Sequence, residues 1–123
     1  MALNVLIVDD SAAIRKILER VLRHTDFQLG DVIEASDGKE ALTKLSGGNV
    51  GLILSDINMP NMDGLEMLQH IKANDEWKNL PIIMVTTEGS QDKVMQAIQL
   101  GATGYIRKPF TADQIKEKLI GIL

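Results

Sequence analysis

The chain alternates short apolar runs with longer stretches of helical periodicity, and this alternation occurs five times. The apolar runs lie at residues 3–8, 32–35, 51–55, 82–85 and 104–107. After each run, apolar residues recur every three or four positions, as they do on one face of a helix, within residues 14–22, 41–45, 65–71, 94–101 and 115–122. Five strand–helix units in succession predict an α/β fold with one parallel sheet and helices on both faces.

Polar residues before three of the helical stretches match known helix N-cap patterns. Asp37 precedes the second helix and is followed three residues later by Glu40. Thr111 and Gln114 form the same pattern before the fifth helix. Both pairs predict a capping box, in which each side chain accepts a hydrogen bond from a backbone amide of the other's residue. Ser90 is the predicted cap of the fourth helix.

The charge content of the apolar runs predicts the order of the strands. The first, third and fourth runs are almost entirely apolar, as expected for strands that are buried on both faces. The second and fifth runs contain Glu34 and Arg107, as expected at sheet edges. These features favour a doubly wound sheet of order 2-1-3-4-5, a known order for such folds. Ligands of these sheets bind at the carboxyl ends of the strands, where the chain reverses direction between the first and third strands.

Five polar residues directly follow four of the apolar runs: Asp9, Asp10, Asp56, Thr86 and Lys108. If the runs are parallel strands, these residues converge on one edge of the sheet. Three carboxylates placed together repel one another strongly unless a cation neutralises them. Oxygen ligands without His or Cys favour Mg²⁺ or Mn²⁺ over zinc. A hydroxyl and an ammonium beside them suit a phosphoryl group.

Each of these residues also has a simpler structural explanation. Asp10 or Ser11 could cap the first helix, and Lys108 could be a surface lysine. Asp56 could begin a turn, although a carboxylate in this position also suits a nucleophile that forms an aspartyl phosphate. Thr87 has the same chemistry as Thr86, so spacing alone leaves the choice between them open. The loop from Asn58 to Gly64, shaped by its proline and glycine, could place a backbone carbonyl on the metal.

Composition and charge narrow the class of protein. The chain has 123 residues, 45% of them hydrophobic, and a net charge of −4 from 17 acidic and 13 basic residues. We expect one domain over residues 1–123 without an output domain. The acidic balance argues against nucleic acid binding. No apolar stretch is long enough for a signal peptide or membrane span. The chain also lacks cysteine, so we expect a soluble cytoplasmic protein.

Together these motifs closely resemble the receiver domain of bacterial two-component response regulators, and within that family its chemotaxis regulators. The resemblance covers essentially the whole chain. The motifs that carry it are Val8-Asp9-Asp10, Ser55-Asp56, Asn58 through Gly64, Val85-Thr86, Gly101 through Tyr105, and Lys108-Pro109-Phe110. The resemblance implies a flavodoxin-like fold and the function of a phosphorylated signalling switch.

The resemblance also implies a role for each site residue. Asp56 would accept the phosphoryl group from a histidine kinase. Asp10, Asp56 and the backbone carbonyl of Asn58 would ligate Mg²⁺, with Mn²⁺ as a substitute, and Asp9 would help partly through water. Lys108 would contact the phosphoryl group, and the Lys108–Pro109 bond would be cis. Thr86, in preference to Thr87, would be the switch hydroxyl, and Tyr105 would swing inward to alter the surface of the fourth helix, fifth strand and fifth helix.

The expected output is binding of a downstream protein, which in chemotaxis would be the flagellar motor switch. We expect a monomer that is no enzyme beyond its own phosphorylation and dephosphorylation. Asn58 and Glu88 resemble residues of fast-decaying chemotaxis regulators, so we expect a phosphoryl lifetime of seconds to minutes. Ser90 and Gln91 replace the basic residues that typically open the fourth helix in motor-binding members, and Lys93 is the nearest cation. This departure weakens the case for motor binding but not for phosphorylation.

Three other functions remain open on the sequence. A phosphorelay carrier would pass its phosphoryl group to a histidine phosphotransfer protein. A metal-dependent phosphatase with an aspartyl-phosphate intermediate usually has a second aspartate two residues after the nucleophile, where this chain has Asn58, which cannot act as a general acid. A binding module that is never phosphorylated is the third alternative.

Overall fold

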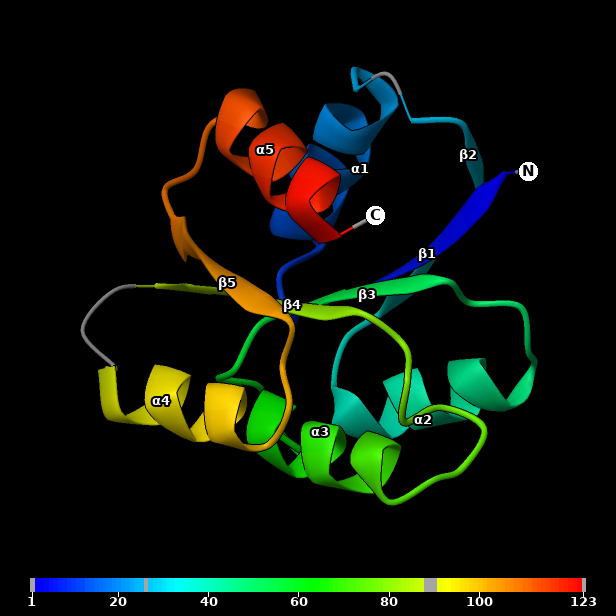
Figure 1. Cartoon of the computed structure of the whole chain (residues 1–123), viewed down its shortest axis with the longest axis vertical. Helices are drawn as coiled ribbons and strands as arrows, with labels where there is room; N and C mark the ends of the chain where they lie inside the picture. The colour runs from blue at the N-terminus through cyan, green and yellow to red at the C-terminus, as the bar shows by residue number, and fades with distance from the viewer. Residues whose placement is uncertain (1, 26, 88–90, 123) are drawn as a thin grey trace.

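A five-stranded parallel sheet forms the centre of the described molecule (Figure 1). The computed structural model describes residues 2–25, 27–87 and 91–122. The strands are β1 (Leu3–Val8), β2 (Leu29–Ala35), β3 (Leu52–Ser55), β4 (Ile82–Thr87) and β5 (Gly104–Lys108). Their order is β2-β1-β3-β4-β5, and every neighbouring pair is parallel. The predicted fold class and strand order are therefore confirmed.

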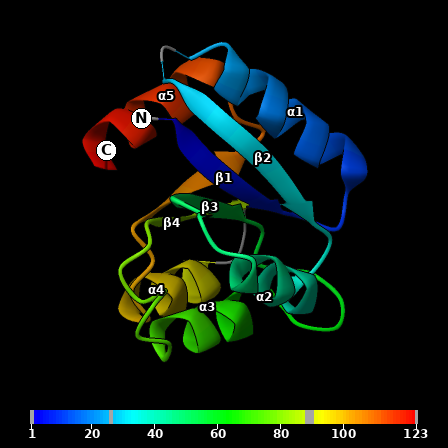
Figure 2. The same ribbon diagram turned by 90° about the vertical axis from the view of Figure 1, so that its right-hand side faces the viewer.

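Helices cover both faces of this sheet. They are α1 (Ala12–Arg23), α2 (Gly38–Ser46), α3 (Gly64–Lys72), α4 (Gln91–Gln99) and α5 (Ala112–Ile122). Helices α1 and α5 lie on one face, and α2, α3 and α4 lie on the other (Figures 1 and 2). None of the helices in the described ranges is long and apolar enough to cross a membrane.

Side-chain caps fix where most of these helices begin. Thr111 and Gln114 bond reciprocally, so the capping box predicted for α5 is present. At α2 the Asp37 carboxylate accepts a hydrogen bond from the Glu40 amide at 2.8 Å, as predicted, but the Glu40 carboxylate accepts from the amide of Ser36 and not from that of Asp37. At α1 the cap is Ser11, whose hydroxyl accepts from the Ile14 amide, so Asp10 remains available for the site. The predicted cap Ser90, like Glu88, lies outside the described residues.

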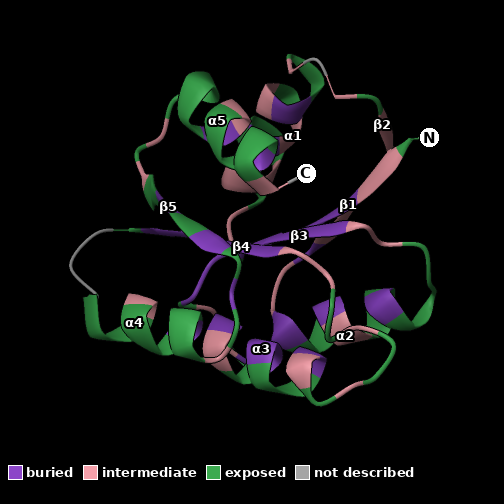
Figure 3. Cartoon of the chain, viewed as in Figure 1, coloured by how far each residue is buried: buried purple, intermediate pink, exposed green. Residues whose placement is uncertain are grey.

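The three central strands are buried on both faces, as their apolar content predicted. Alternate side chains of β1, β3 and β4 face opposite layers of helices: Leu6, Ile53 and Met84 pack with α2 and α3, whereas Ile7, Leu54 and Val85 pack with α1 and α5. The edge strands β2 and β5 are only partly buried (Figure 3). Burial of apolar area on both faces is the main source of stability, and it fixes the strand ends that hold the polar site.

The strand boundaries differ from the predicted runs mainly at β2. This strand begins at Leu29, three residues earlier than its apolar run, because its first residues pair with β1 along the sheet edge although they include Gly30 and Asp31. The fifth strand extends through Lys108, which pairs with Thr87 of β4. Lys108 is therefore positioned by the sheet ladder itself.

Candidate metal and phosphoryl site

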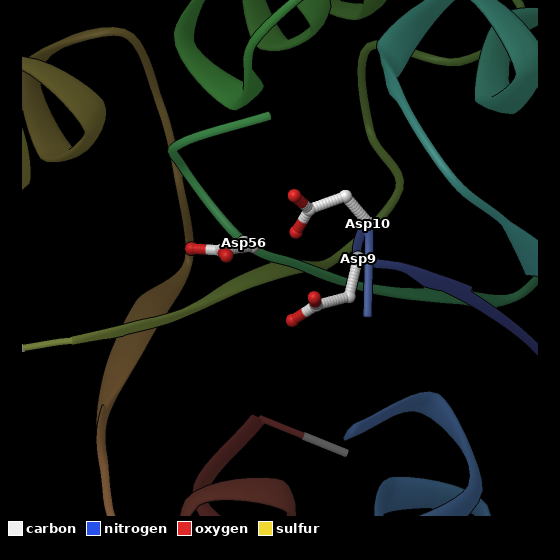
Figure 4. Close-up of side chains that lie close together, drawn as sticks. All are labelled: Asp9, Asp10 and Asp56. Carbon is white, nitrogen blue, oxygen red and sulfur yellow. The ribbon is translucent and has the colours of Figure 1, made fainter. Parts of the chain in front are cut away.

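Three carboxylates meet at the carboxyl edge of the sheet, as the strand order predicted. Asp9 and Asp10 follow β1, and Asp56 follows the neighbouring strand β3 (Figure 4). One carboxylate oxygen from each residue lies within 4.8 Å of the others. The Asp56 amide donates to the Val8 carbonyl at 2.9 Å, which extends the β1–β3 ladder into the site. The residues Asp9 and Asp56 are buried, whereas Asp10 is exposed.

Lys108 reaches into the same cluster from the end of β5. Its Nζ atom lies 2.7 Å from Asp9 Oδ2 and 3.3 Å from Asp56 Oδ2. Its side chain is mostly buried, with 13% of its surface exposed. The peptide bond between Lys108 and Pro109, which the resemblance implied to be cis, has the cis conformation. The structure therefore excludes the alternative of a solvent-directed surface lysine.

Burial and charge act against each other on the ionisable groups of this site. Burial is the main reason that the pKa of Asp56 is raised, and the nearby Asp9 carboxylate adds to it, while Lys108 and the Ile57 amide act in the opposite direction. For Lys108, burial alone would lower the pKa. Its hydrogen bond to Asp9 and the charges of Asp56 and Asp9 outweigh that effect, so the pKa of Lys108 is raised. The ammonium is thus held in its charged form.

The donor set of this cluster fits a hard divalent cation. Three carboxylates face one ammonium, so the cluster carries excess negative charge. Within the described ranges, no hydrogen bond or ion pair compensates the Asp10 carboxylate, whose oxygen lies within the 4.8 Å cluster. All available side-chain ligands are oxygens, which are the ligands that Mg²⁺ and Mn²⁺ prefer. The residues present therefore fit the metal that the resemblance implies.

The loop between Asp56 and α3 is held closely against the site. Gly64 donates its amide to the Ile57 carbonyl at 2.7 Å. A Cβ atom on Gly64 would lie 2.3 Å from the Asp56 carbonyl oxygen, so a side chain there would displace the backbone that carries the phosphoacceptor candidate. Asn61 has a positive φ of 65° and donates to the Asp37 carboxylate at 2.8 Å. Gly64 therefore shapes this loop, as predicted.

Asn58 lies at the exposed start of this loop, two residues after Asp56. Its side chain turns to α4, where Asn58 Oδ1 accepts a hydrogen bond from Lys93 Nζ at 2.7 Å. No pattern in the sequence predicts this contact, since the two residues are far apart in the chain and neither belongs to an apolar pattern.

The structure distinguishes Thr86 from Thr87. Thr86 is 1% exposed at the end of β4, whereas Thr87 is exposed. The Thr86 hydroxyl donates to the Thr87 carbonyl at 3.2 Å. Tyr105 on β5 pairs with Met84 of β4, and the residue is 40% exposed. Both Thr86 and Tyr105 line an open groove of about 830 Å³ beside α4. The two predicted switch residues therefore share one space.

Asp63 is a structural residue that the sequence reasoning did not identify. It caps α3, with its carboxylate accepting from the Glu66 amide at 2.9 Å. The spacing of Asp63 and Glu66 is a capping signal that could have been recognised in the sequence. This cap fixes the end of the loop that begins at Asp56.

Comparison with known proteins agrees with this geometry. A family model described as response regulator receiver domain matches residues 5–120. The chain belongs to the response regulator receiver family. This receiver is 41% identical to the chemotaxis protein CheY of Pseudomonas aeruginosa, with 95% of this chain and 93% of that protein covered. The predicted CheY-like response regulator of two-component signalling, with chemotaxis as its setting, is thereby confirmed.

Solved structures extend the comparison to the three-dimensional fold. The receiver superimposes on the chemotaxis response regulator CheY4 of Vibrio cholerae with a TM-score of 0.88 and 36% identity, over 100% of both chains. A CheX–CheY–BeF₃–Mg²⁺ complex from Borrelia burgdorferi gives a TM-score of 0.87 at 31% identity, covering 98% of this chain and 88% of that chain. Magnesium is therefore present in the complex of a structural neighbour of this receiver.

Proposed function

We propose that this receiver accepts a phosphoryl group on Asp56 from a histidine kinase, in a reaction that requires Mg²⁺. The observation that carries the proposal is the position of the buried Asp56 carboxylate. It lies 3.3 Å from the Lys108 ammonium and in one cluster with Asp9 and Asp10. A nucleophile, a cation and two further carboxylates in this arrangement serve phosphoryl transfer, which depends on positioning and charge neutralisation.

The chain fixes the orientation of the nucleophile before any donor arrives. Asp56 Oδ1 accepts a hydrogen bond from the Ile57 amide at 2.7 Å, and Asp56 Oδ2 faces Lys108. Ile57 is fully buried, so this part of the backbone is well packed. The flexible Lys108 ammonium is suited to a point contact with a phosphoryl oxygen. In this role it would offset the negative charge on the transferring group.

Asp9, Asp10, Asp56 and the backbone carbonyl of Asn58 would hold the metal, with Asp9 acting partly through water. When bound, Mg²⁺ supplies neutralising charge to the phosphoryl oxygens, and Mn²⁺ is an acceptable substitute. The excess negative charge of the cluster and the Mg²⁺ present in the Borrelia complex support this assignment. Lys108 remains beside Asp9 and Asp56 to contact the phosphoryl group.

The direct test is labelling with acetyl phosphate in the presence and absence of Mg²⁺. Wild-type protein should incorporate one phosphoryl group only with the metal, and Asp56→Asn should incorporate none. Asp75→Asn is the matched control, since the side chain of Asp75 is 96% exposed in the segment after α3, and it should label normally. Incorporation by Asp56→Asn equal to that of wild type would refute the assignment of the phosphoacceptor.

We propose that Thr86 and Tyr105 transmit the phosphorylated state. A phosphoryl group on Asp56 would draw the buried Thr86 hydroxyl away from the Thr87 carbonyl, and the ring of Tyr105 would move into the vacated space. Phosphorylation can shift this equilibrium only through its different interaction with the two states. We expect Thr86→Ala to accept phosphate at a nearly normal level but to lose most of the gain in partner binding. Normal partner binding by phosphorylated Thr86→Ala would contradict the scheme.

The proposed setting is cytoplasmic chemotaxis signalling, with a histidine kinase as donor and a downstream protein as target. The target would bind the surface formed by α4, β5 and α5, where Tyr105 lies beside the open groove. A phosphatase function has less support. The Asn58 side chain two residues after the nucleophile is an amide bound to Lys93, and it cannot protonate a leaving group.

A further inference from the structure

Helix α4 is lightly anchored among the described helices. Ala97 is its one buried residue, while Met95 and Ile98 are 58% and 42% exposed. Val94 is partly buried against the core. Burying alanine removes little apolar area from water, so packing alone holds this helix weakly. Polar contacts at its ends therefore have a larger share in fixing its position.

One such contact joins the first turn of α4 to the candidate site. Lys93 is the third residue of the helix, and its Nζ atom donates to Asn58 Oδ1 at 2.7 Å. A hydrogen bond from an ammonium is stronger than one between neutral groups. Both residues are exposed, so solvent competes for this bond and limits its contribution.

The position of Asn58 gives this contact its significance. The backbone just before Asn58 is fixed, because Ile57 is fully buried and bonds through its amide to Asp56 and through its carbonyl to Gly64. Asn58 emerges from this fixed segment, and its own carbonyl is the proposed fourth metal ligand. The Lys93 ammonium thus holds the first residue of the loop that extends beyond the core.

We propose that Lys93 is a positioning residue that couples α4 to the metal site through Asn58. By ordering Asn58 before the metal arrives, the contact lowers the entropy cost of using its carbonyl as a ligand. Since coupling between two sites is reciprocal, metal bound at the carboxylates in turn favours the position of α4 that Lys93 maintains. This inference rests on the proposed function only for the location of the metal.

The test is a double-mutant cycle in Mg²⁺ affinity, measured by titration calorimetry on the full chain. The cycle compares wild type, Lys93→Met, Asn58→Ala and the double variant. If Lys93→Met acted only by removing a positive charge near the carboxylates, it would strengthen Mg²⁺ binding by the same factor with or without the Asn58 side chain. The positioning effect requires that side chain. We therefore expect the change in Mg²⁺ affinity caused by Lys93→Met to differ between the two backgrounds. It should be about two- to fivefold less favourable in the wild-type background than in the Asn58→Ala background.

Two further variants separate positioning from charge. Lys93→Arg retains a donor and the charge, and it should retain most of the coupling. Lys44→Met removes an exposed lysine from the last turn of α2 and should give no coupling to Asn58. A second readout is the change in backbone amide resonances of α4 when Mg²⁺ is added. This change should be reduced in both Lys93→Met and Asn58→Ala.

Each outcome bears on a distinct claim. If Lys93→Met has the same effect on Mg²⁺ affinity in both backgrounds, and the α4 resonances respond as in wild type, the positioning role is overturned while the metal site stands. If wild-type protein does not bind Mg²⁺, the proposed function and this inference fail together. Coupling of the expected sign with retained binding supports both.

Discussion

Helices α3 and α4 lie on the same face of the sheet and have the same length of nine residues, yet they are held very differently (Figure 1). Helix α3 buries four residues, Gly64, Met67, Leu68 and Ile71, and begins at the Asp63 cap. Helix α4 buries only Ala97 in its described length and presents Met95 and Ile98 to solvent.

This difference corresponds to the two halves of the proposed function. Helix α3 continues directly from the loop after Asp56, so its packing keeps the proposed phosphoacceptor in place. Helix α4 borders the groove that contains Thr86 and Tyr105, where the signal would be read. Segments with few buried apolar contacts cost less free energy to displace. The proposed phosphorylation chemistry therefore lies beside the firmly packed helix α3, and the proposed response lies beside the loosely packed helix α4.

The strongest test of this comparison is truncation of one large apolar residue in each helix. Leu68→Ala removes a fully buried side chain from α3 and should lower the free energy of unfolding by about 2–5 kcal/mol. Met95→Ala removes a side chain from an exposed position of α4 and should change it by no more than about 0.5 kcal/mol. Urea denaturation measures both values. Similar losses in the two variants would show that α4 is packed as firmly as α3.

The central strands and the carboxylates that follow them were largely predictable from the sequence. Apolar runs without charges identified the central strands, and the residues after those runs identified Asp9, Asp10 and Asp56 as neighbours. This worked because burial on both faces of a parallel sheet leaves few alternatives for strand order. Asp63 could also have been recognised from its spacing to Glu66.

The region around helix α4 was harder to predict, because the roles of its residues depend on tertiary contacts. Spacing could not separate Thr86 from Thr87, which differ in burial and not in chemistry. The contact between Lys93 and Asn58 joins two exposed residues that are distant in the chain. Local sequence patterns do not predict which exposed polar side chains come into contact when they are distant in the chain. The same holds for the position of Lys118 over the ring of Tyr105.

A second prediction concerns the folding stability that is lost because the Asp56 carboxylate is buried. The pKa of Asp56 is raised in the folded protein, mainly by burial, so the folded state binds this proton more tightly than the unfolded state does. Stability contributed by this group is present below its unfolded pKa of about 3.9 and is lost as the pH rises through the folded pKa. With a chelator present at pH 7, Asp56→Asn should therefore unfold at higher urea than wild type.

This advantage of Asp56→Asn should shrink as the pH falls through the raised pKa of the wild-type carboxyl, because that carboxyl then becomes protonated. We expect it to be smaller than the cost of Leu68→Ala, because Lys108 offsets part of the burial penalty. Asp75→Asn, at an exposed position, should show no comparable pH-dependent gain. If Asp56→Asn is less stable than wild type at pH 7 without metal, the ionised Asp56 carboxylate does not destabilise the folded protein.

The smallest expected effect concerns the orientation of the Tyr105 ring, which borders the groove beside α4. The Lys118 ammonium on α5 lies 5.8 Å from the centre of the Tyr105 ring, a distance suited to a cation–π contact. The Lys118 stem also lies over Gly104, where an added Cβ would meet its Cδ at 3.4 Å. Lys118→Met keeps an apolar stem of similar reach and removes the charge. Since an exposed cation–π contact is worth about 0.5–1 kcal/mol, the outward orientation of Tyr105 should become less favoured by about two- to fivefold.

Tyr105 is the only tyrosine of the chain, so selective isotope labelling of tyrosine reports on this ring alone by NMR. In Lys118→Met, magnetisation transfer from the ring to the Thr86 methyl group should increase, and transfer to residue 118 should decrease. Lys118→Arg retains a cation over the ring and should resemble wild type. If the ring keeps its wild-type contacts in Lys118→Met, the outward position is fixed by the packing of β5 itself. The response would then require displacement of the strand in addition to rotation of one side chain.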